Sequence, residues 1–418
     1  MTREEHYNNI KDLFKTNKSL MLKLPTSFGK SKIAIDLIND TDITQEETLF
    51  ESATNVLIVV PRLVLIDNWK AEIAKWKLKD TCRVTFTTYV SFPKHAETHW
   101  NFIIFDEGHH FTDNCADAFI SFTYDKVIFM SATFPKQQRF RIKSTVRGIS
   151  EYTVTARDAI TDSILPDPKV ILVPMMLDNT KVSQILIKNK SKSGSPVKCF
   201  FKDRFNYQRS YPNRPLHIYC TQQEYYNELN YLIDFWKQKF LSSGAQFQKN
   251  LWLRKAKDRL DWLALQKEKV VEHILSCVED YRTLTFCTSI EQTERLGKYP
   301  VNSKNAESKN NLEMFNTGKI KHITSVGMLN EGVNLLNCQI GIYANIGSSE
   351  IIEIQRLGRI LRVDNPLIII PFYVGTREEE IVSKMIKNYN PSLMFKLFTS
   401  QLTKDNIKKI YDKTKDNN

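Results

Sequence analysis

The chain has 418 residues, of which 42% are hydrophobic and 25% charged, and its formal net charge is +12. A chain of this length is too long for a single ordinary hydrophobic core, so two domains are expected. The composition is that of a globular protein rather than a disordered one. The longest apolar run, PLIIIPFYV, is too short to cross a bilayer, and the start MTREEHYNNIKD lacks the apolar segment of a secretory signal.

Charge and cysteine content narrow the class of protein further. The excess of basic residues fits a polyanionic partner, but it equally fits a chain that is merely rich in lysine. The seven cysteines form no CxxC pair, which argues against a zinc site and against a disulfide framework. A reducing cytoplasm is therefore expected.

The first third of the chain alternates apolar, strand-like runs with helical stretches. Helices are predicted from Lys30 and through LVLIDNWKAEIAKW. The strand-like runs lie at 20–24, 55–60, 83–89, 101–105 and 126–132. Strands that alternate with helices predict a mostly parallel sheet with helices on both faces, and such sheets bind ligands at the carboxyl ends of their strands.

The stretch LPTSFGKSK, residues 24–32, lies between a predicted strand and a predicted helix. A loop that binds phosphate needs backbone amides at a helix N-terminus, a lysine for phosphate oxygens and a hydroxyl for magnesium. Gly29, Lys30 and Ser31 supply these parts, although Leu24 stands where the general pattern has its first glycine. The alternative is a chance GKS in a turn.

The stretch FIIFDEGHHF, residues 102–111, ends an apolar strand on two adjacent carboxylates. Paired like charges near a core are costly unless a cation neutralises them. With a nucleotide on the phosphate loop, Asp106 would hold Mg²⁺ through water and Glu107 would act as the base for an attacking water. The alternative is a helix-capping Asp beside a solvated Glu.

The rest of the chain predicts a second α/β unit that carries a helical insertion. Residues 160–215 are rich in proline and irregular, and residues 222–280 are helical and aromatic. Strand-like runs return at 283–289, 321–326, 339–345 and 366–374. The tryptophans of the insertion either pack the helices together or stack on bases, and they are Trp236, Trp252 and Trp262.

Eight short motifs, taken in order, resemble those of the superfamily 2 helicases and translocases of the DExH kind. In the first half they are PTSFGKS, VVPRLVLIDNW, FTTY, DEGH and SAT. In the second half they are TFCTS, TSVGMLNEGVN and QRLGRILR. The resemblance implies two tandem RecA-like domains with ATP in the cleft between them. The domains expected are 1–158, 159–380 with its insertion at 222–280, and a helical tail at 381–418.

The resemblance assigns roles by motif position. The catalytic residues expected are Lys30, Asp106, Glu107, Gln355, Arg359 and Arg362, with both arginines acting as fingers on the γ-phosphoryl group. ATP would be bound by Tyr7, Asn8, Pro25, Thr26, Ser27, Phe28, Gly29, Lys30, Ser31, Gly332 and Asn334, and Mg²⁺ would be held at Ser31 and Asp106. In isolation the two arginines could equally form a basic helix face.

Further positions would couple hydrolysis to movement on a strand. His109, Ser131 and Thr133 would relay the state of the nucleotide, His109 through Gln355. Arg62, Thr88, Thr288 and Thr324 would contact the nucleic-acid backbone, and each could instead be an ordinary loop residue.

Three departures from the family pattern affect the nucleotide site. Ser27 and Phe28 replace a glycine and a small residue, so a bulkier loop is expected. Tyr7-Asn8 stands where relatives carry an aromatic residue and a glutamine, and asparagine offers the same amide edge on a shorter stem. Asn334 replaces a common aspartate.

The function that follows is an ATP-dependent helicase or translocase acting on single-stranded or branched DNA, in a bacterial or phage-infected cytoplasm. The sequence resembles phage recombination, branch-migration and restriction-type members, so replication, recombination or restriction proteins are expected partners, and a membrane is not. The alternatives are an RNA helicase, the ATPase motor of a restriction or defence complex with little unwinding of its own, and a metabolic P-loop kinase.

Overall fold

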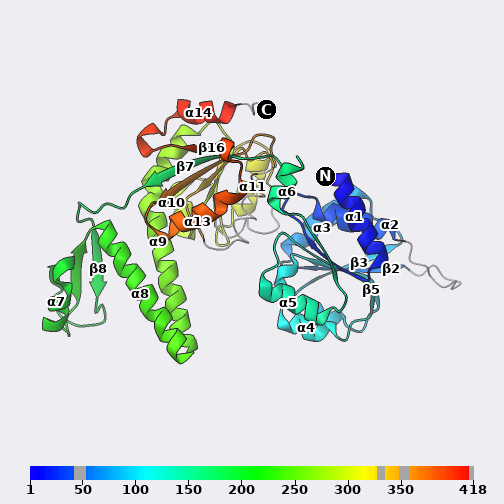
Figure 1. Cartoon of the computed structure of the whole chain (residues 1–418), viewed down its shortest axis with the longest axis horizontal. Coiled ribbons are helices and arrows are strands. Elements are labelled where there is room, and N and C mark those ends of the chain that lie inside the picture. The colour runs from blue at the N-terminus through cyan, green and yellow to red at the C-terminus, as the bar shows by residue number, and fades with distance from the viewer. Residues whose placement is uncertain (42–52, 327–334, 348–357, 359, 361, 414–418) are drawn as a thin grey trace.

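In the computed structural model, the residues described are 1–41, 53–326, 335–347, 358, 360 and 362–413. They form two α/β lobes, and a smaller module projects from the second (Figure 1). Within these ranges no helix is long and apolar enough to cross a membrane. The predicted α/β class with two parallel sheets is confirmed.

The first lobe is built on a sheet of six parallel strands in the order β3-β2-β4-β5-β1-β6. The strands are β1 Ser19–Lys23, β2 Thr54–Val60, β3 Cys82–Thr88, β4 Trp100–Asp106, β5 Tyr124–Ser131 and β6 Ser150–Thr153. Five of them lie on the predicted apolar runs. The sixth, with the sequence SEYT, is short and incompletely buried, so it lacks the hydrophobic signal of a core strand.

Helices cover both faces of this sheet because successive strand residues point in opposite directions. Leu20 and Leu22 of β1 pack with α1 to α3, whereas Met21 packs with α4 and α5 on the other side. The helices are α1 Arg3–Thr16, α2 Lys30–Asp40, α3 Val64–Trp76, α4 Asp113–Phe119, α5 Lys136–Thr145 and α6 Ala156–Thr161.

The second lobe has seven parallel strands in the order β12-β13-β11-β14-β15-β7-β16. The strands are β7 Lys169–Met175, β11 Thr283–Phe286, β12 Pro300–Val301, β13 His322–Ser325, β14 Ile340–Tyr343, β15 Leu367–Tyr373 and β16 Met394–Lys396. Its helices include α10 Ile290–Leu296, α11 Ser308–Asn316, α13 Arg377–Met385 and α14 Lys404–Asp412. The stretch expected to be irregular supplies β7, and the tail expected to be helical supplies β16, so both differ from the prediction.

The chain between β7 and β11 forms the projecting module. A three-stranded sheet, in the order β8-β10-β9, precedes a long helical hairpin. The elements are β8 Gln184–Lys188, β9 Val197–Phe200, α7 Arg204–Ser210, β10 Leu216–Cys220, α8 Gln222–Ser243 and α9 Gln246–Cys277. The hairpin agrees with the predicted helical insertion. Thr221 caps the start of α8 in a capping box with Glu224, and Gly244 ends it at φ 67°.

Two of the three tryptophans of the insertion pack within it. Trp262 stacks on Tyr225 with ring centroids 5.0 Å apart, and its indole N–H donates to Gln184 Oε1 at 3.0 Å. Trp252 stacks on Phe240 across the hairpin at 6.1 Å. Their rings are therefore used to hold the module together, which supports the packing interpretation for these two residues.

Candidate functional site

The loop between β1 and α2 has the backbone shape that a phosphate-binding loop requires. Ser27 has φ 70° and Gly29 has φ 104°, both in the left-handed region. Gly29 is the N-cap of α2 and provides no side-chain cap, so the first amides of the helix remain available to an anion. Lys30 and Ser31 follow in the first helical turn.

Phe28 lines the pocket, but the volume that it adds to the loop is directed mainly into the core. Its side chain is only 1% exposed and is part of the core beneath α1. His6 meets it edge-on, with ring centroids 5.6 Å apart. The extra volume is taken up by the core, because α1 offers an aromatic partner at this position.

Asp106 and Glu107 lie at the end of β4 and are held by different neighbours. Trp69 Nε1 donates to Asp106 Oδ2 at 2.9 Å, while Lys30 Nζ lies 3.7 Å from Glu107 Oε1. Burial, followed by the adjacent Glu107 charge, raises the pKa of Asp106 from 3.8 to about 6. A cation at this carboxylate would offset both effects, so these residues fit the expected magnesium site. No group of three or more metal-ligating side chains occurs among the described residues, and phosphate oxygens and water would have to complete the coordination.

Asp106→Asn should stabilise the ligand-free protein at neutral pH. With the pKa of Asp106 raised to about 6, the folded chain holds this proton more tightly than the unfolded chain, so stability falls as pH rises from 3.8 to about 6 and stays lower at pH 7. The uncharged amide avoids that loss, which a shift from 3.8 to about 6 makes roughly 3 kcal/mol at pH 7. Thermal unfolding at pH 7 and pH 4 measures it: the gain should appear at pH 7 and shrink at pH 4. Asp117→Asn, on the exposed face of α4, is the control, and a variant less stable than the parent at pH 7 would contradict the assignment.

His109 and Ser131 connect the carboxylate pair to the end of β5. His109 Nδ1 lies 2.9 Å from Ser131 Oγ, and Ser131 Oγ donates to Glu107 Oε2 at 3.2 Å. Thr133 N donates to the same Ser131 hydroxyl, while the buried Thr133 hydroxyl has no hydrogen-bond partner among the residues described. His109 and Thr133 therefore both bond to the hydroxyl of Ser131, so the three predicted coupling residues are in contact.

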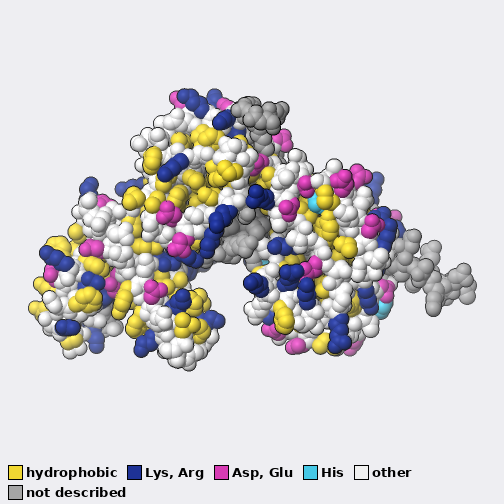
Figure 2. All heavy atoms as spheres, viewed as in Figure 1, with side chains coloured by type: hydrophobic (Ala, Val, Ile, Leu, Met, Phe, Trp, Pro, Cys, Tyr) yellow, Lys and Arg dark blue, Asp and Glu magenta, His cyan; other side chains and the backbone are white. Residues whose placement is uncertain are grey.

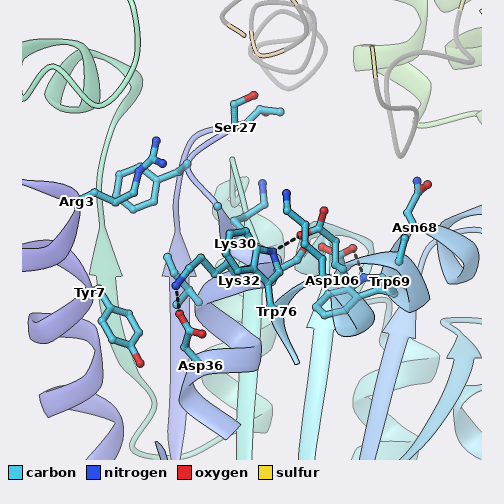
Figure 3. Close-up of a pocket in the computed structure, with 18 of the residues that line it drawn as sticks. Arg3, Tyr7, Ser27, Lys30, Lys32, Asp36, Asn68, Trp69, Trp76 and Asp106 are labelled. Atoms are coloured by element: carbon cyan, nitrogen blue, oxygen red, sulfur yellow. Dashed lines mark hydrogen bonds and ion pairs between the residues drawn. The ribbon is translucent and has the colours of Figure 1, made fainter. Parts of the chain in front are cut away.

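The phosphate-binding loop and the two carboxylates, Asp106 and Glu107, line one pocket of about 960 Å³ (Figure 3). Its walls are the loop after β1, the first turns of α2, one face of α3, the carboxylates after β4 and the start of α1. Several lining residues were not predicted from the sequence, and they include Arg3, Lys32, Asp36, Trp69, Glu72 and Trp76. Trp69 and Trp76 lie seven positions apart on α3, a spacing that places both on one helical face and could have indicated them.

The second lobe reaches this pocket through Arg362, which is one of its lining residues. Arg362 Nε donates to Ser27 Oγ at 3.2 Å, and Ser27 Oγ donates to the carbonyl of Gly358 at 2.9 Å. A Cβ at Gly358 would lie 2.1 Å from Thr26 Cβ, so glycine permits the close approach of the two lobes. Burial lowers the pKa of Arg362, and the charge of Glu72 opposes that shift. The serine that replaces the usual glycine thus bridges the lobes.

Several predicted residues are not brought into the site. Asn8 is exposed on α1 and does not line the pocket, and Pro25 is buried behind the loop. Tyr7 lines the pocket, but its hydroxyl donates to Asp40 Oδ2 at 2.8 Å, at the far end of α2. The predictions at Gln355, Arg359, Gly332 and Asn334 lie outside the described residues.

The four predicted strand-contact residues differ in accessibility. Arg62 is exposed ahead of α3, and Thr88 is half-buried at the end of β3. Thr288 is half-buried and donates its hydroxyl proton to Asp261 Oδ1 at 2.7 Å. The prediction for Thr324 is wrong. Its side chain is fully buried in β13 and donates to the carbonyl of Thr293, so it cannot contact nucleic acid.

Two family profiles match the chain. The profile of "Type III restriction enzyme, res subunit" covers residues 2–136, and that of "Helicase conserved C-terminal domain" covers residues 266–364. No curated protein matches the sequence. The two profiles fall on the two lobes and leave the projecting sheet and most of the hairpin unmatched.

Solved structures of similar fold cover nearly the whole chain. Saccharomyces cerevisiae Dbp5 bound to RNA and ADP BeF3 has a TM-score of 0.57 at 10% identity, over 94% of this chain and 88% of that one. The Pyrococcus furiosus Hef helicase domain has a TM-score of 0.51 at 13% identity, over 91% and 97% of the chains. The ATP-dependent Type ISP restriction-modification enzyme LlaBIII bound to DNA has a TM-score of 0.56 at 13% identity, over 98% of this chain and 32% of that one. The two sheets therefore match tandem RecA-like domains, as predicted.

Proposed function

Because this chain is a superfamily 2 helicase with restriction-type relatives, we propose that it couples ATP hydrolysis to movement along nucleic acid, with DNA as the strand it acts on. One observation carries the proposal: Arg362 of the second lobe lines the same pocket as Lys30 and Asp106 of the first. A nucleotide in that pocket would be held by both lobes, so its hydrolysis would change how they meet.

Different residues around the pocket would have different roles in phosphoryl transfer. The amides at the start of α2 and the Lys30 ammonium would bind phosphate oxygens, while Ser31 and Asp106 would hold the metal. When bound, Mg²⁺ would neutralise negative charge on the phosphates. Glu107 accepts the proton of the attacking water, and Ser131 and His109 hold its carboxylate in place. Arg362 stabilises the charge that develops on the transferred group.

The polynucleotide would cross the exposed ends of both lobes. Arg62 and Thr88 of the first lobe are the accessible candidates, and Thr288 of the second lobe would have to exchange its bond to Asp261 for a phosphate contact. Contacts of this kind bind the backbone without reading sequence. We propose DNA rather than RNA as the substrate because the first lobe matches a restriction-enzyme family.

A second candidate function is the ATPase motor of a restriction or defence complex. The match of residues 2–136 to the restriction-enzyme profile favours it, and LlaBIII, with which this chain shares a fold, is about three times longer than the aligned part. A stable partner on purification, with little unwinding by the chain alone, would favour this function over an independent helicase.

The test is the ATPase rate with no nucleic acid, single-stranded DNA, forked DNA and RNA. We expect a bound strand to stimulate the rate, because it would favour the approach of the two lobes that complete the pocket. DNA should stimulate more than RNA, because the first lobe matches a restriction-enzyme family. Glu107→Gln is the matched control: it keeps the shape of the side chain, and turnover should fall about 100-fold while ATP still binds. A rate that no polynucleotide changes would contradict the proposal, and normal hydrolysis by Glu107→Gln would remove Glu107 from its role.

A further inference from the structure

The small sheet of the projecting module has one covered face and one open face. Leu186, Cys199 and Ile218 are buried with α7 and α8. The residues between them point the other way, because strand side chains alternate. In register they form two rows across β8, β10 and β9, here called the open face: Ile187, His217 and Lys198 in one row, and Ile185, Tyr219 and Phe200 in the other.

The open face exposes large apolar side chains to solvent. Ile185 is 50% exposed and Phe200 is 56% exposed. The rings of Phe200 and Tyr219 are neighbours on adjacent strands, with centroids 6.4 Å apart. Apolar side chains clustered in this way on a surface indicate a binding site rather than scattered exposure.

The segment that forms this sheet is also strongly basic. Residues 181–220 contain nine lysines and arginines and a single carboxylate, Asp203, so their net charge is +8, compared with +12 for the whole chain. Two of these cations, Lys188 and Arg204, pair with Glu228 of α8. Figure 2 shows hydrophobic and basic side chains mixed over the module that lies apart from the two lobes. Lysine is depleted in protein–protein interfaces, so this combination favours a polyanion over a protein.

We propose that the open face is a second nucleic-acid site, where a single strand stacks bases on Phe200 and Tyr219 while Lys198 contacts a phosphate. Aromatic rings that take successive bases, together with a basic surface along the backbone, are how single strands are bound without sequence preference. The inference rests on the proposed function and adds to it a contact remote from the nucleotide pocket.

The position of the module separates this contact from catalysis. In Figure 1 the small sheet lies at the outer end of the insertion, on the far side of the second lobe from the first lobe. Its loss should therefore weaken strand affinity without changing ATP turnover at saturating strand concentrations.

The test measures the affinity of the full chain for fluorescein-labelled oligo-dT and oligo-U by anisotropy, and the ATPase rate beside it. Phe200→Ala combined with Tyr219→Ala should weaken binding about 10-fold or more. Lys198→Gln should weaken binding less and lower the salt dependence, as expected for one lost phosphate contact. Both variants should keep the melting temperature and the saturated ATPase rate of the parent.

The matched control is Phe205→Ala, since Phe205 on α7 is also 56% exposed but lies off the open face. It should bind as the parent does. Parental affinity in the double variant, or an equal loss in Phe205→Ala, would overturn the inference. So would dimerisation of the parent that the double variant abolishes, because the face would then be a protein interface. Failure of the proposed function has a different signature, namely an ATPase rate in the parent that no strand changes.

Discussion

Lys30→Ala should lower ATP turnover by about 1,000-fold or more, while affinity for a single strand stays close to that of the parent. Lys30 begins α2, lines the pocket and lies 3.7 Å from Glu107, so its removal takes away the cation that serves both the phosphates and the catalytic carboxylate. The strand-contact candidates lie outside this pocket, which is why binding should survive. Single-turnover ATPase assays and oligonucleotide anisotropy measure the two effects.

The control for Lys30→Ala is a double variant that also removes the charge of Glu107. Without the lysine, Glu107 loses a nearby ammonium charge, so thermal unfolding should show some destabilisation, and Lys30→Ala combined with Glu107→Gln should recover it without recovering turnover. A loss of strand binding as large as the loss of turnover would contradict the separation of the two sites.

Arg362→Ala should also depress turnover by about 1,000-fold, with ATP binding largely retained. The guanidinium reaches the pocket from the opposite lobe and donates to Ser27 Oγ in the loop that would hold the phosphates. Its fork can bind two phosphate oxygens together, and the single ammonium of Arg362→Lys cannot, so the lysine variant should not restore the rate.

The matched control for Arg362 is Arg377→Ala, an exposed arginine of the same lobe that pairs with Glu380. Its turnover should equal that of the parent. If Arg362→Ala hydrolyses ATP at the parental rate, Arg362 is a structural link between the lobes and the finger assignment is wrong. Equal melting temperatures for both variants would exclude unfolding as the cause of a loss.

The sequence by itself determined the local parts of this protein. Apolar runs with the strand period predicted five of the six strands of the first sheet, and the glycine before Lys30 predicted the turn into α2. Both signals are local, because a strand or a loop of this kind depends on neighbouring residues. The same reasoning placed Asp106 and Glu107 at the end of a strand next to that loop.

Only the tertiary structure decided which distant residues meet. Arg362 and Ser27 are 335 positions apart, and their contact depends on how two separate cores pack. Thr324 was expected at the surface, yet its side chain is buried, because burial follows from the elements that pack above a residue rather than from its motif. The open face of the small sheet was likewise beyond the sequence, since its rows bring together three strands whose register is set by cross-strand pairing.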